Sequence, residues 1–237
     1  ECRAMIAMKT IGLIGGMSWE STALYYRLIN NGVQQALGGL HSAQIILYSV
    51  DFAPIEKLQR GGNWGRAAAI LAQAAQTLQA GGADFLLLCT NTMHKVADEI
   101  SSAVDIPFVH LADATAEELQ AESTQRAALL GTAFTIEQDF YTGILQRKYG
   151  MKVLLPGAED KALVHRVIYD EFCQGRVEPG SRASYLRIIE ELSRQGAQAV
   201  ILGCTEIGLL VKQEDTAVQL FDTTAIHARK AVKLALA

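Results

Sequence analysis

Short apolar runs alternate with helix-like stretches along the chain, and this alternation limits the fold more than any other feature of the sequence. The helix-like stretches include 18–37, with Ser18 as the predicted N-cap, and an Ala-rich segment over 64–82. Strands that are apolar throughout and separated by helices are typical of parallel sheets covered on both faces. The sequence therefore predicts an α/β fold. The apolar runs lie at 10–16, 43–50, 83–90, 106–111, 126–132, 152–156, 197–205 and 217–222.

The second half of the chain resembles the first. "GADFLLLCTNT" (82–92) aligns without a gap on "GAQAVILGCTE" (196–206), "IGLIGG" (11–16) on "AALLGT" (127–132), and "HLADAT" (110–115) on "LFDTT" (220–224). Any two strand–helix units share an apolar alphabet, but three matches in the same order favour a duplication. We predict two pseudo-symmetric α/β domains, each a mostly parallel sheet flanked by helices. The first comprises 8–107 plus 217–237, the second 108–216, and 1–7 form a tail or a remnant.

Composition restricts the class of partner. The 237 residues carry a net charge of −4, so the chain offers no electrostatic reason to bind nucleic acid or a membrane surface. No apolar run approaches the roughly 20 residues of a membrane helix, and the N-terminus does not resemble a signal peptide. The cysteines, Cys2, Cys89, Cys173 and Cys204, have no metal-binding spacing, which indicates reduced thiols in the cytoplasm. Cys2 lies in the tail, and Cys173 is predicted to be a buried apolar residue.

Small polar clusters lie where the predicted strands end. They are Gly15–Ser18, Thr90–Thr92, Gly131–Thr132 and Cys204–Glu206. Ligands of parallel α/β sheets bind beyond these carboxyl ends, and a following helix favours an anion such as a carboxylate. Each Ser or Thr could also serve only as a helix cap. The other motifs are weak, because "GLIGG" is not GxGxxG, there is no P-loop, and the five histidines lack metal-ligand spacing.

The stretch "LLLCTNTMHK" (86–95) raises the question of whether Cys89 or Thr90 performs chemistry. In the internal alignment Thr90 matches Cys204, and Cys89 matches Gly203. Side chains alternate in direction along a strand, so Cys89 is predicted to point away from the side that Thr90 uses. A bulge that returns Cys89 to the site is the alternative.

The motifs "IGLIGGMSWEST", "CTNTMH", "GTAFT" and "GCTEIGLLV" resemble the aspartate/glutamate racemase family from Met8 to the C-terminus. The resemblance implies a cofactor-independent isomerase with no metal, two pseudo-symmetric domains and an active site between them. In that family one cysteine thiolate removes the Cα proton of an amino acid and a second thiol protonates the other face. The substrate carboxylate is expected on Asn91, Thr92 and Thr205. Many relatives are dimers, so a homodimer is possible.

The chain departs from the family pattern because Thr90 stands where the first catalytic cysteine is usual, and only Cys204 keeps its place. A threonine hydroxyl has no accessible pKa in water, and each pKa unit is worth about 1.36 kcal/mol. We therefore predict that the catalytic pair, Thr90 and Cys204, exchanges the α-proton of L-substrates readily but inverts slowly.

The side-chain pocket and the exact reaction are less constrained by the sequence. Candidate side-chain partners are Gln59, Arg60 and His165, and the lining candidates are Met17, Ser18, Thr132 and Glu206. Aspartate or glutamate is the expected substrate, and the sequence shows no committed carboxylate clamp. The alternatives are a broad-specificity amino-acid racemase, a single-cysteine decarboxylase of malonate-like acids, and a catalytically silent amino-acid binding protein.

Overall fold

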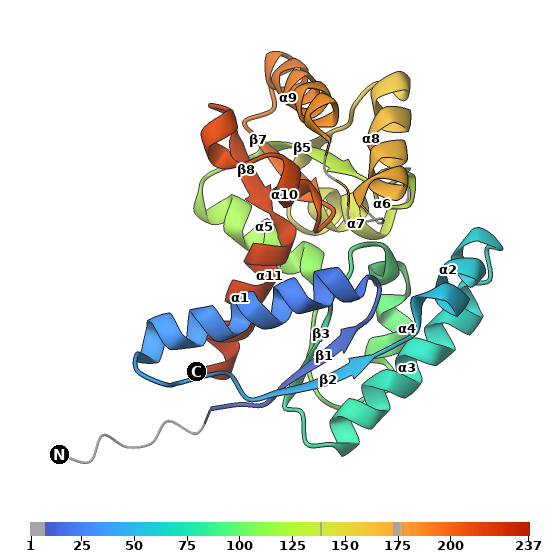
Figure 1. Cartoon of the computed structure of the whole chain (residues 1–237), viewed down its shortest axis with the longest axis vertical. Helices are drawn as coiled ribbons and strands as arrows, with labels where there is room; N and C mark the ends of the chain where they lie inside the picture. Colours follow the sequence, from blue (N-terminus) through green and yellow to red (C-terminus); the bar gives the residue numbers. More distant parts are fainter. Residues whose placement is uncertain (1–7, 138, 173–175, 177) are drawn as a thin grey trace. The chain divides into compact units, whose positions relative to one another are not determined.

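The computed structural model describes residues 8–137, 139–172, 176 and 178–237 (Figure 1). Cys2 and Cys173 lie outside these residues. The chain forms two compact units: the first runs to His110 and also includes His227–Ala237, and the second is Leu111–Ile226. Residues 217–226 were predicted to belong to the first domain, but they fall in the second unit, because their strand pairs with that unit's sheet. Residues 108–110 were predicted to belong to the second domain, but they fall in the first unit, because their strand pairs with the first sheet.

The first unit is built on a parallel sheet with strand order β2-β1-β3-β4. Helices α1 and α11 cover one face of this sheet, and α2, α3 and α4 cover the other (Figure 1). Its elements are β1 (Ile11–Gly15), α1 (Trp19–Leu37), β2 (Ile45–Ser49), α2 (Phe52–Arg60), α3 (Trp64–Ala80), β3 (Phe85–Leu88), the 3-10 helix η1 (Thr92–Val96), α4 (Ala97–Ser101), β4 (Phe108–Val109) and most of α11 (Thr223–Ala235).

The second unit repeats this plan with the strand order β6-β5-β7-β8, again parallel. Its core lies in two layers, one on each face of the sheet. Its elements are α5 (Leu111–Ala121), β5 (Arg126–Gly131), α6 (Ala133–Glu137), α7 (Asp139–Gly143), the π-helix η2 (Ile144–Lys148), β6 (Lys152–Leu154), α8 (Ala158–Asp170), α9 (Pro179–Arg194), β7 (Ala199–Gly203), α10 (Ile207–Leu210), the 3-10 helix η4 (Gln213–Asp215) and β8 (Gln219–Asp222).

The register of the two sheets supports the internal alignment. Ile11 of β1 pairs with Phe85 of β3, and the residues aligned with them, Ala127 and Ala199, also pair with each other. The predicted α/β class with two parallel sheets is therefore confirmed. Most predicted strands and helices are found within two or three residues, and the segment after β3 divides into η1 and α4. No helix among the described residues is long and apolar enough to cross a membrane.

Gly16 shapes the exit of β1. Its φ is +98°, which L side chains rarely adopt, and an added Cβ would lie 2.2 Å from the carbonyl oxygen of Val50. Only glycine fits this close approach, and it lets the chain turn from β1 toward α1. The predicted N-cap is confirmed two residues later, where the Ser18 side chain accepts a hydrogen bond from the backbone N–H of Ser21 at 3.2 Å.

Candidate active site

The predicted site residues that follow β1 and β3 lie at the carboxyl ends of these two strands. These strands are neighbours, and the Cys89 N–H continues their ladder by donating to the Ile14 carbonyl at 2.9 Å. The Ser21 hydroxyl of α1 donates to the Cys89 carbonyl at 3.4 Å and ties the helix to the turn after β3. The predicted residues Met17, Ser18, Thr90, Asn91 and Thr92 therefore follow two adjacent strands of one sheet. We call these five residues the first strand-end cluster.

The structure separates Cys89 from Thr90. Cys89 is fully buried in the apolar core formed with α1 and α11, and this burial raises the pKa of its thiol far above the ordinary value. Thr90, the next residue, is only half-buried. A buried thiol that strongly resists ionisation is poorly suited to remove a proton from a substrate. The predicted opposite orientation of Cys89 agrees with this burial.

The turn after β3 is held by His94. Its Nδ1 lies 2.7 Å from the Thr90 carbonyl oxygen, and its backbone N–H donates to the Asn91 carbonyl at 3.1 Å. The Thr90 N–H turns back to the Leu88 carbonyl at 2.9 Å. Within the described part of the chain, no hydrogen bond involves the Thr90 hydroxyl.

Two candidates for the substrate side chain, Gln59 and Arg60, are the last two residues of α2. Gln59 is buried, and its amide nitrogen is 2.8 Å from the Met93 sulfur, which places it against η1. Arg60 extends into solvent and forms an ion pair with Glu56, one turn earlier on the same helix. Gln59 therefore supports the segment that follows Thr90, whereas Arg60 is a surface charge.

In the second unit the turn after β5 carries Thr132. Thr132 is buried, and its hydroxyl lies 3.2 Å from the Thr135 hydroxyl and accepts the Thr135 N–H at 3.3 Å. His165 of α8 joins this turn, because its Nδ1 accepts the Ala133 N–H at 3.2 Å. Thr132 thus caps the short helix α6, and His165 lies at the same strand end.

The end of β7 carries the residues most suited to proton transfer. The Cys204 thiol donates to Glu206 Oε2 at 3.1 Å, and the Thr205 hydroxyl donates to the same oxygen at 2.5 Å. Cys204 is half-buried and Thr205 is buried. Tyr185 of α9 lies nearby; burial raises its pKa most strongly, and Cys204 and Glu171 add to the rise. A thiol and a carboxylate are thus in direct contact at this strand end.

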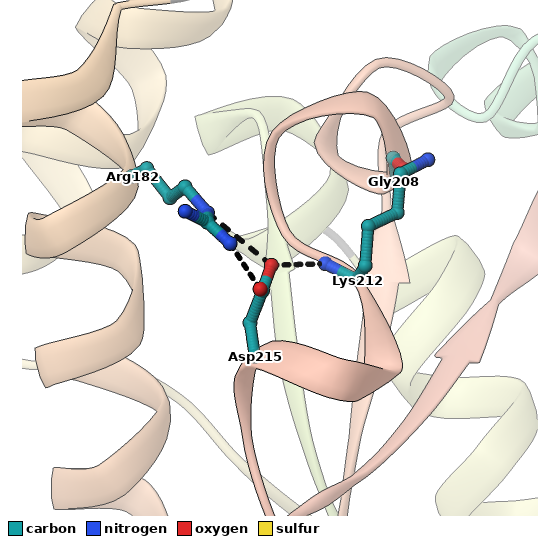
Figure 2. A network of polar contacts seen from close by, with 4 residues as sticks. All are labelled: Arg182, Gly208, Lys212 and Asp215. Atoms are coloured by element: carbon teal, nitrogen blue, oxygen red, sulfur yellow. Dashed lines mark hydrogen bonds and ion pairs between the residues drawn. The ribbon is translucent and has the colours of Figure 1, made fainter.

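An ionic network supports the segment that follows Glu206. Figure 2 shows Asp215 of η4 bound by the Arg182 guanidinium of α9 and by the backbone N–H of Lys212 at 2.8 Å. The Lys212 ammonium donates to the Gly208 carbonyl of α10. The Lys212 N–H is the largest cause that holds the Asp215 pKa below its usual range. The loop that begins at Cys204 is therefore tied back to α9.

Sequence reasoning missed a cluster of three histidines in the first unit. The ring centroids of His94 and His110 are 4.7 Å apart, and those of His94 and His227 are 5.9 Å apart. Burial, with the neighbouring imidazoles, lowers the pKa of both His94 and His227. Among the described residues no group of histidines, cysteines or acids has a metal-binding arrangement. The cluster could have been predicted only from two tertiary facts: β3 pairs with β4, and the C-terminal helix α11 packs on the first unit's sheet.

The internal alignment pairs the two strand ends residue by residue. Thr90 corresponds to Cys204, and Thr92 corresponds to Glu206. One unit therefore presents a thiol in contact with a carboxylate, and the other presents two hydroxyl groups. Side chains that can donate or accept a proton, at matching strand ends of a duplicated α/β chain, fit the class of enzymes that remove and return protons.

Comparison with known proteins agrees with this class. Residues 14–231 match the model of the family Asp/Glu/Hydantoin racemase, and the chain belongs to this family. A Yersinia pestis crystal structure, provisionally named an Asp/Glu racemase, is 53% identical, covers 97% of this chain and 100% of its own, and has a TM-score of 0.92. The protein is accordingly an isomerase of the racemase type.

Two further relatives cover nearly the whole chain. An aspartate racemase homologue from Pyrococcus horikoshii OT3 is 35% identical, with coverage of 96% of this chain and 99% of its own and a TM-score of 0.83. The broad specificity amino-acid racemase RacX of Bacillus subtilis (strain 168) is 24% identical over 230 residues, which is 96% of this chain and 98% of that protein. The expected family is therefore confirmed.

Proposed function

We propose that the protein is a cofactor-independent racemase of aspartate or glutamate that removes and returns the Cα proton and exchanges it preferentially in the L-enantiomer. The observation that carries this proposal is the contact of the Cys204 thiol with the Glu206 carboxylate, 3.1 Å, at a strand end whose duplicate carries Thr90. The family membership supports the racemase chemistry. The site residues and the substrate are the parts that experiment must test.

The proposed reaction starts at Cys204. Its thiol passes its proton to Glu206, and the resulting thiolate takes the Cα proton of an L-amino acid to leave a planar carbanion. If the reformed thiol has meanwhile exchanged its hydrogen with solvent, returning it to the same face gives an L-product with a solvent-derived proton, and Glu206 then returns its proton to the Cys204 thiolate. If Thr90 protonates the opposite face, the product is the D-amino acid, and Glu206 returns its proton through solvent to the Thr90 oxygen. Each step conserves the charge of the site.

Thr90 limits inversion in this scheme. A cysteine thiol has an ordinary pKa near 8.5, and an aliphatic hydroxyl is a far weaker acid. The Thr90 hydroxyl has no described hydrogen-bond partner comparable to Glu206. Protonation through Thr90 should therefore be slower than return through Cys204.

The remaining predicted residues are proposed to bind the substrate. The α-carboxylate is assigned to Asn91, Thr92 and Thr205, and Gln59 and His165 are the candidates for the substrate side chain. The lining residues of this proposal are Met17, Ser18, Thr132 and Glu206.

Broad specificity is the second candidate. The relative in Bacillus subtilis carries that description, and Arg60, the cationic candidate for the substrate side chain, is paired with Glu56 at the surface. We further propose a cytoplasmic enzyme, because its half-buried thiol must stay reduced, and a homodimer, for which gel filtration with light scattering is the test.

The test is proton NMR of L-aspartate and L-glutamate with the enzyme in heavy water, followed by chiral analysis of the same tube. Loss of the α-proton signal should require Cys204 and survive Cys89→Ala, the control for a buried thiol. Thr90→Cys should raise inversion at least about tenfold relative to exchange.

Other outcomes point elsewhere. Exchange of many neutral amino acids would favour broad specificity, and carbon dioxide release from a disubstituted malonate would favour a decarboxylase. Saturable binding without exchange would mean a silent binding protein. Exchange that persists in Cys204→Ser would refute the proposed role of Cys204.

A further inference from the structure

The histidine cluster of the first unit consists of His94 on η1, His110 after β4 and His227 on α11, and the proposed reaction does not use it. His94 and His227 are buried, with 2% and 0% of their surface exposed. Tyr25 of α1 closes the cluster, because its hydroxyl lies 2.9 Å from His227 Nδ1. Polar groups at this depth need hydrogen-bond partners, so their contacts define which atom carries each hydrogen.

The contacts fix the hydrogens of two rings. A carbonyl oxygen only accepts, so His94 Nδ1, at 2.7 Å from the Thr90 oxygen, carries a hydrogen and donates it. His227 Nε2 donates in the same way to the Val109 carbonyl at 2.8 Å, which leaves its Nδ1 to accept the Tyr25 hydroxyl when the ring is neutral. His94 is therefore an N–H donor aimed at the residue that we assign to catalysis.

The geometry of the peptide bond extends this contact to Asn91. The Thr90 carbonyl and the Asn91 N–H belong to one planar trans peptide, so they point in opposite directions. The His94 side chain holds the carbonyl and thereby directs the Asn91 N–H away from the histidine cluster. The backbone N–H of His94 holds the Asn91 carbonyl at 3.1 Å and fixes the next peptide in the same way.

The strand does not supply this constraint. β3 ends at Leu88, and the Thr90 N–H has already turned back to the Leu88 carbonyl at 2.9 Å. The orientation of the Thr90 peptide thus depends on His94 rather than on the sheet ladder. A small rotation of this peptide would move both the Thr90 side chain and the Asn91 N–H.

We propose that His94 is a positioning residue that, through its hydrogen bond to the Thr90 carbonyl, fixes the orientation of Thr90 and Asn91 toward the substrate. This inference rests on the proposed function of Thr90 and Asn91. This role is positioning and not proton transfer, because the contact that His94 Nδ1 makes is with the Thr90 carbonyl and not with its hydroxyl.

Three substitutions separate positioning from packing. Asn places its amide nitrogen one bond from Cγ, as His places Nδ1, so His94→Asn can keep the hydrogen bond. Gln carries its nitrogen one bond further out, where His has Nε2, and His94→Gln is the matched control with the wrong reach. His94→Leu keeps an apolar side chain of moderate volume and removes the donor.

The experiment measures α-proton exchange and inversion of L-aspartate in the same sample for each variant. Misplacement of a catalytic group by about 1 Å can cost ~100-fold, so His94→Leu and His94→Gln should lower the inversion-to-exchange ratio by ~10-fold or more and raise KM. His94→Asn should retain a ratio within ~3-fold of the wild type. A loss of folded protein would lower both rates by the same factor and leave their ratio unchanged.

The outcomes distinguish this inference from the proposed function. If exchange and inversion fall equally in His94→Leu and His94→Gln, or if His94→Asn does no better than they do, the positioning role is overturned. If the wild type exchanges no α-proton, the proposed function fails, and calorimetric affinity for L-aspartate becomes the readout. Equal affinity in the wild type and His94→Gln, or no binding at all, would then overturn the role of His94.

Discussion

Acidification should destabilise the protein through His227, and the structure gives the size of the effect. The side chain is fully buried against Tyr25, His94 and His110, and burial is the largest cause that lowers its pKa to about 4 from the ordinary 6.5. The unfolded chain therefore binds a proton at a higher pH than the folded chain does. Stability is fully present above pH 6.5 and is lost as the pH falls toward 4.

The magnitude follows from the difference in pKa. A difference of about 2.5 units corresponds to about 3.4 kcal/mol once the pH is below both values. At pH 5.0 the unfolded imidazole is nearly saturated with protons and the folded one is not, which gives a loss of about 2 kcal/mol. His94 should add to this loss, because its pKa is also lowered.

The assay is urea unfolding at pH 7.5 and pH 5.0 for the wild type and His227→Gln. Gln can still donate to the Val109 carbonyl but does not titrate, so its loss of unfolding free energy between the two pH values should be smaller by about 2 kcal/mol. His41→Gln, at an exposed histidine, controls for removal of an imidazole outside the cluster. Equal losses in the wild type and His227→Gln would refute the reasoning.

The remaining predictions concern reactivity, backbone conformation and the missing carboxylate. In a variant with Cys2→Ser and Cys173→Ser, Cys89 should not react with disulfide reagents until the protein unfolds, because its thiol is buried. Rapid labelling of Cys89 in the native state would contradict this burial. Gly16→Ala should lower the unfolding free energy by roughly 3 kcal/mol, because the added Cβ would meet the backbone of Val50. Gly38→Ala is the control, since Gly38 also has a positive φ but open space around it, and it should cost only about 1 kcal/mol. Equal losses in urea unfolding would refute the steric argument. Thr92 stands where the second unit has the Glu206 carboxylate. Thr92→Glu added to Thr90→Cys should raise the KM of inversion, measured by chiral analysis, several-fold, because a carboxylate there repels the substrate α-carboxylate assigned to Thr92; an unchanged KM would refute that assignment.

The pattern of apolar residues was sufficient to predict the fold class, because a strand of a parallel sheet is buried on both faces and therefore reads as a continuous apolar run. The alternation of side chains along a strand predicts that Cys89 and Thr90 point to opposite sides, and the burial of Cys89 is consistent with that prediction. The first unit's boundary was harder to predict. The last strand, β8, follows a polar segment and could join either sheet by sequence, and only its pairing with β7 decides.

The histidine cluster illustrates the part that sequence could not supply. His94 lies in η1, His110 directly follows β4, and His227 lies in α11, 117 positions after His110. Their contact depends on β3 lying beside β4 and on the C-terminal helix packing on that sheet. A motif search detects local spacing, whereas this site is defined by tertiary adjacency.

The two strand ends are unequal, because Cys204 contacts the Glu206 carboxylate and the Thr90 hydroxyl has no hydrogen bond within the part of the chain that the structure describes. Detailed balance limits what this inequality can do. Enantiomers have equal free energies in an achiral solvent, so kcat/KM for inversion must be the same in both directions whatever residues the enzyme uses. The difference between Cys204 and Thr90 therefore cannot make racemisation one-way. The difference can appear in two ways only. For one enantiomer the α-proton can exchange with solvent faster than the substrate inverts, or kcat and KM can differ between the two directions by the same factor. A racemase that loses one of its two thiols becomes a stereoselective exchanger of hydrogen before it becomes an inactive enzyme.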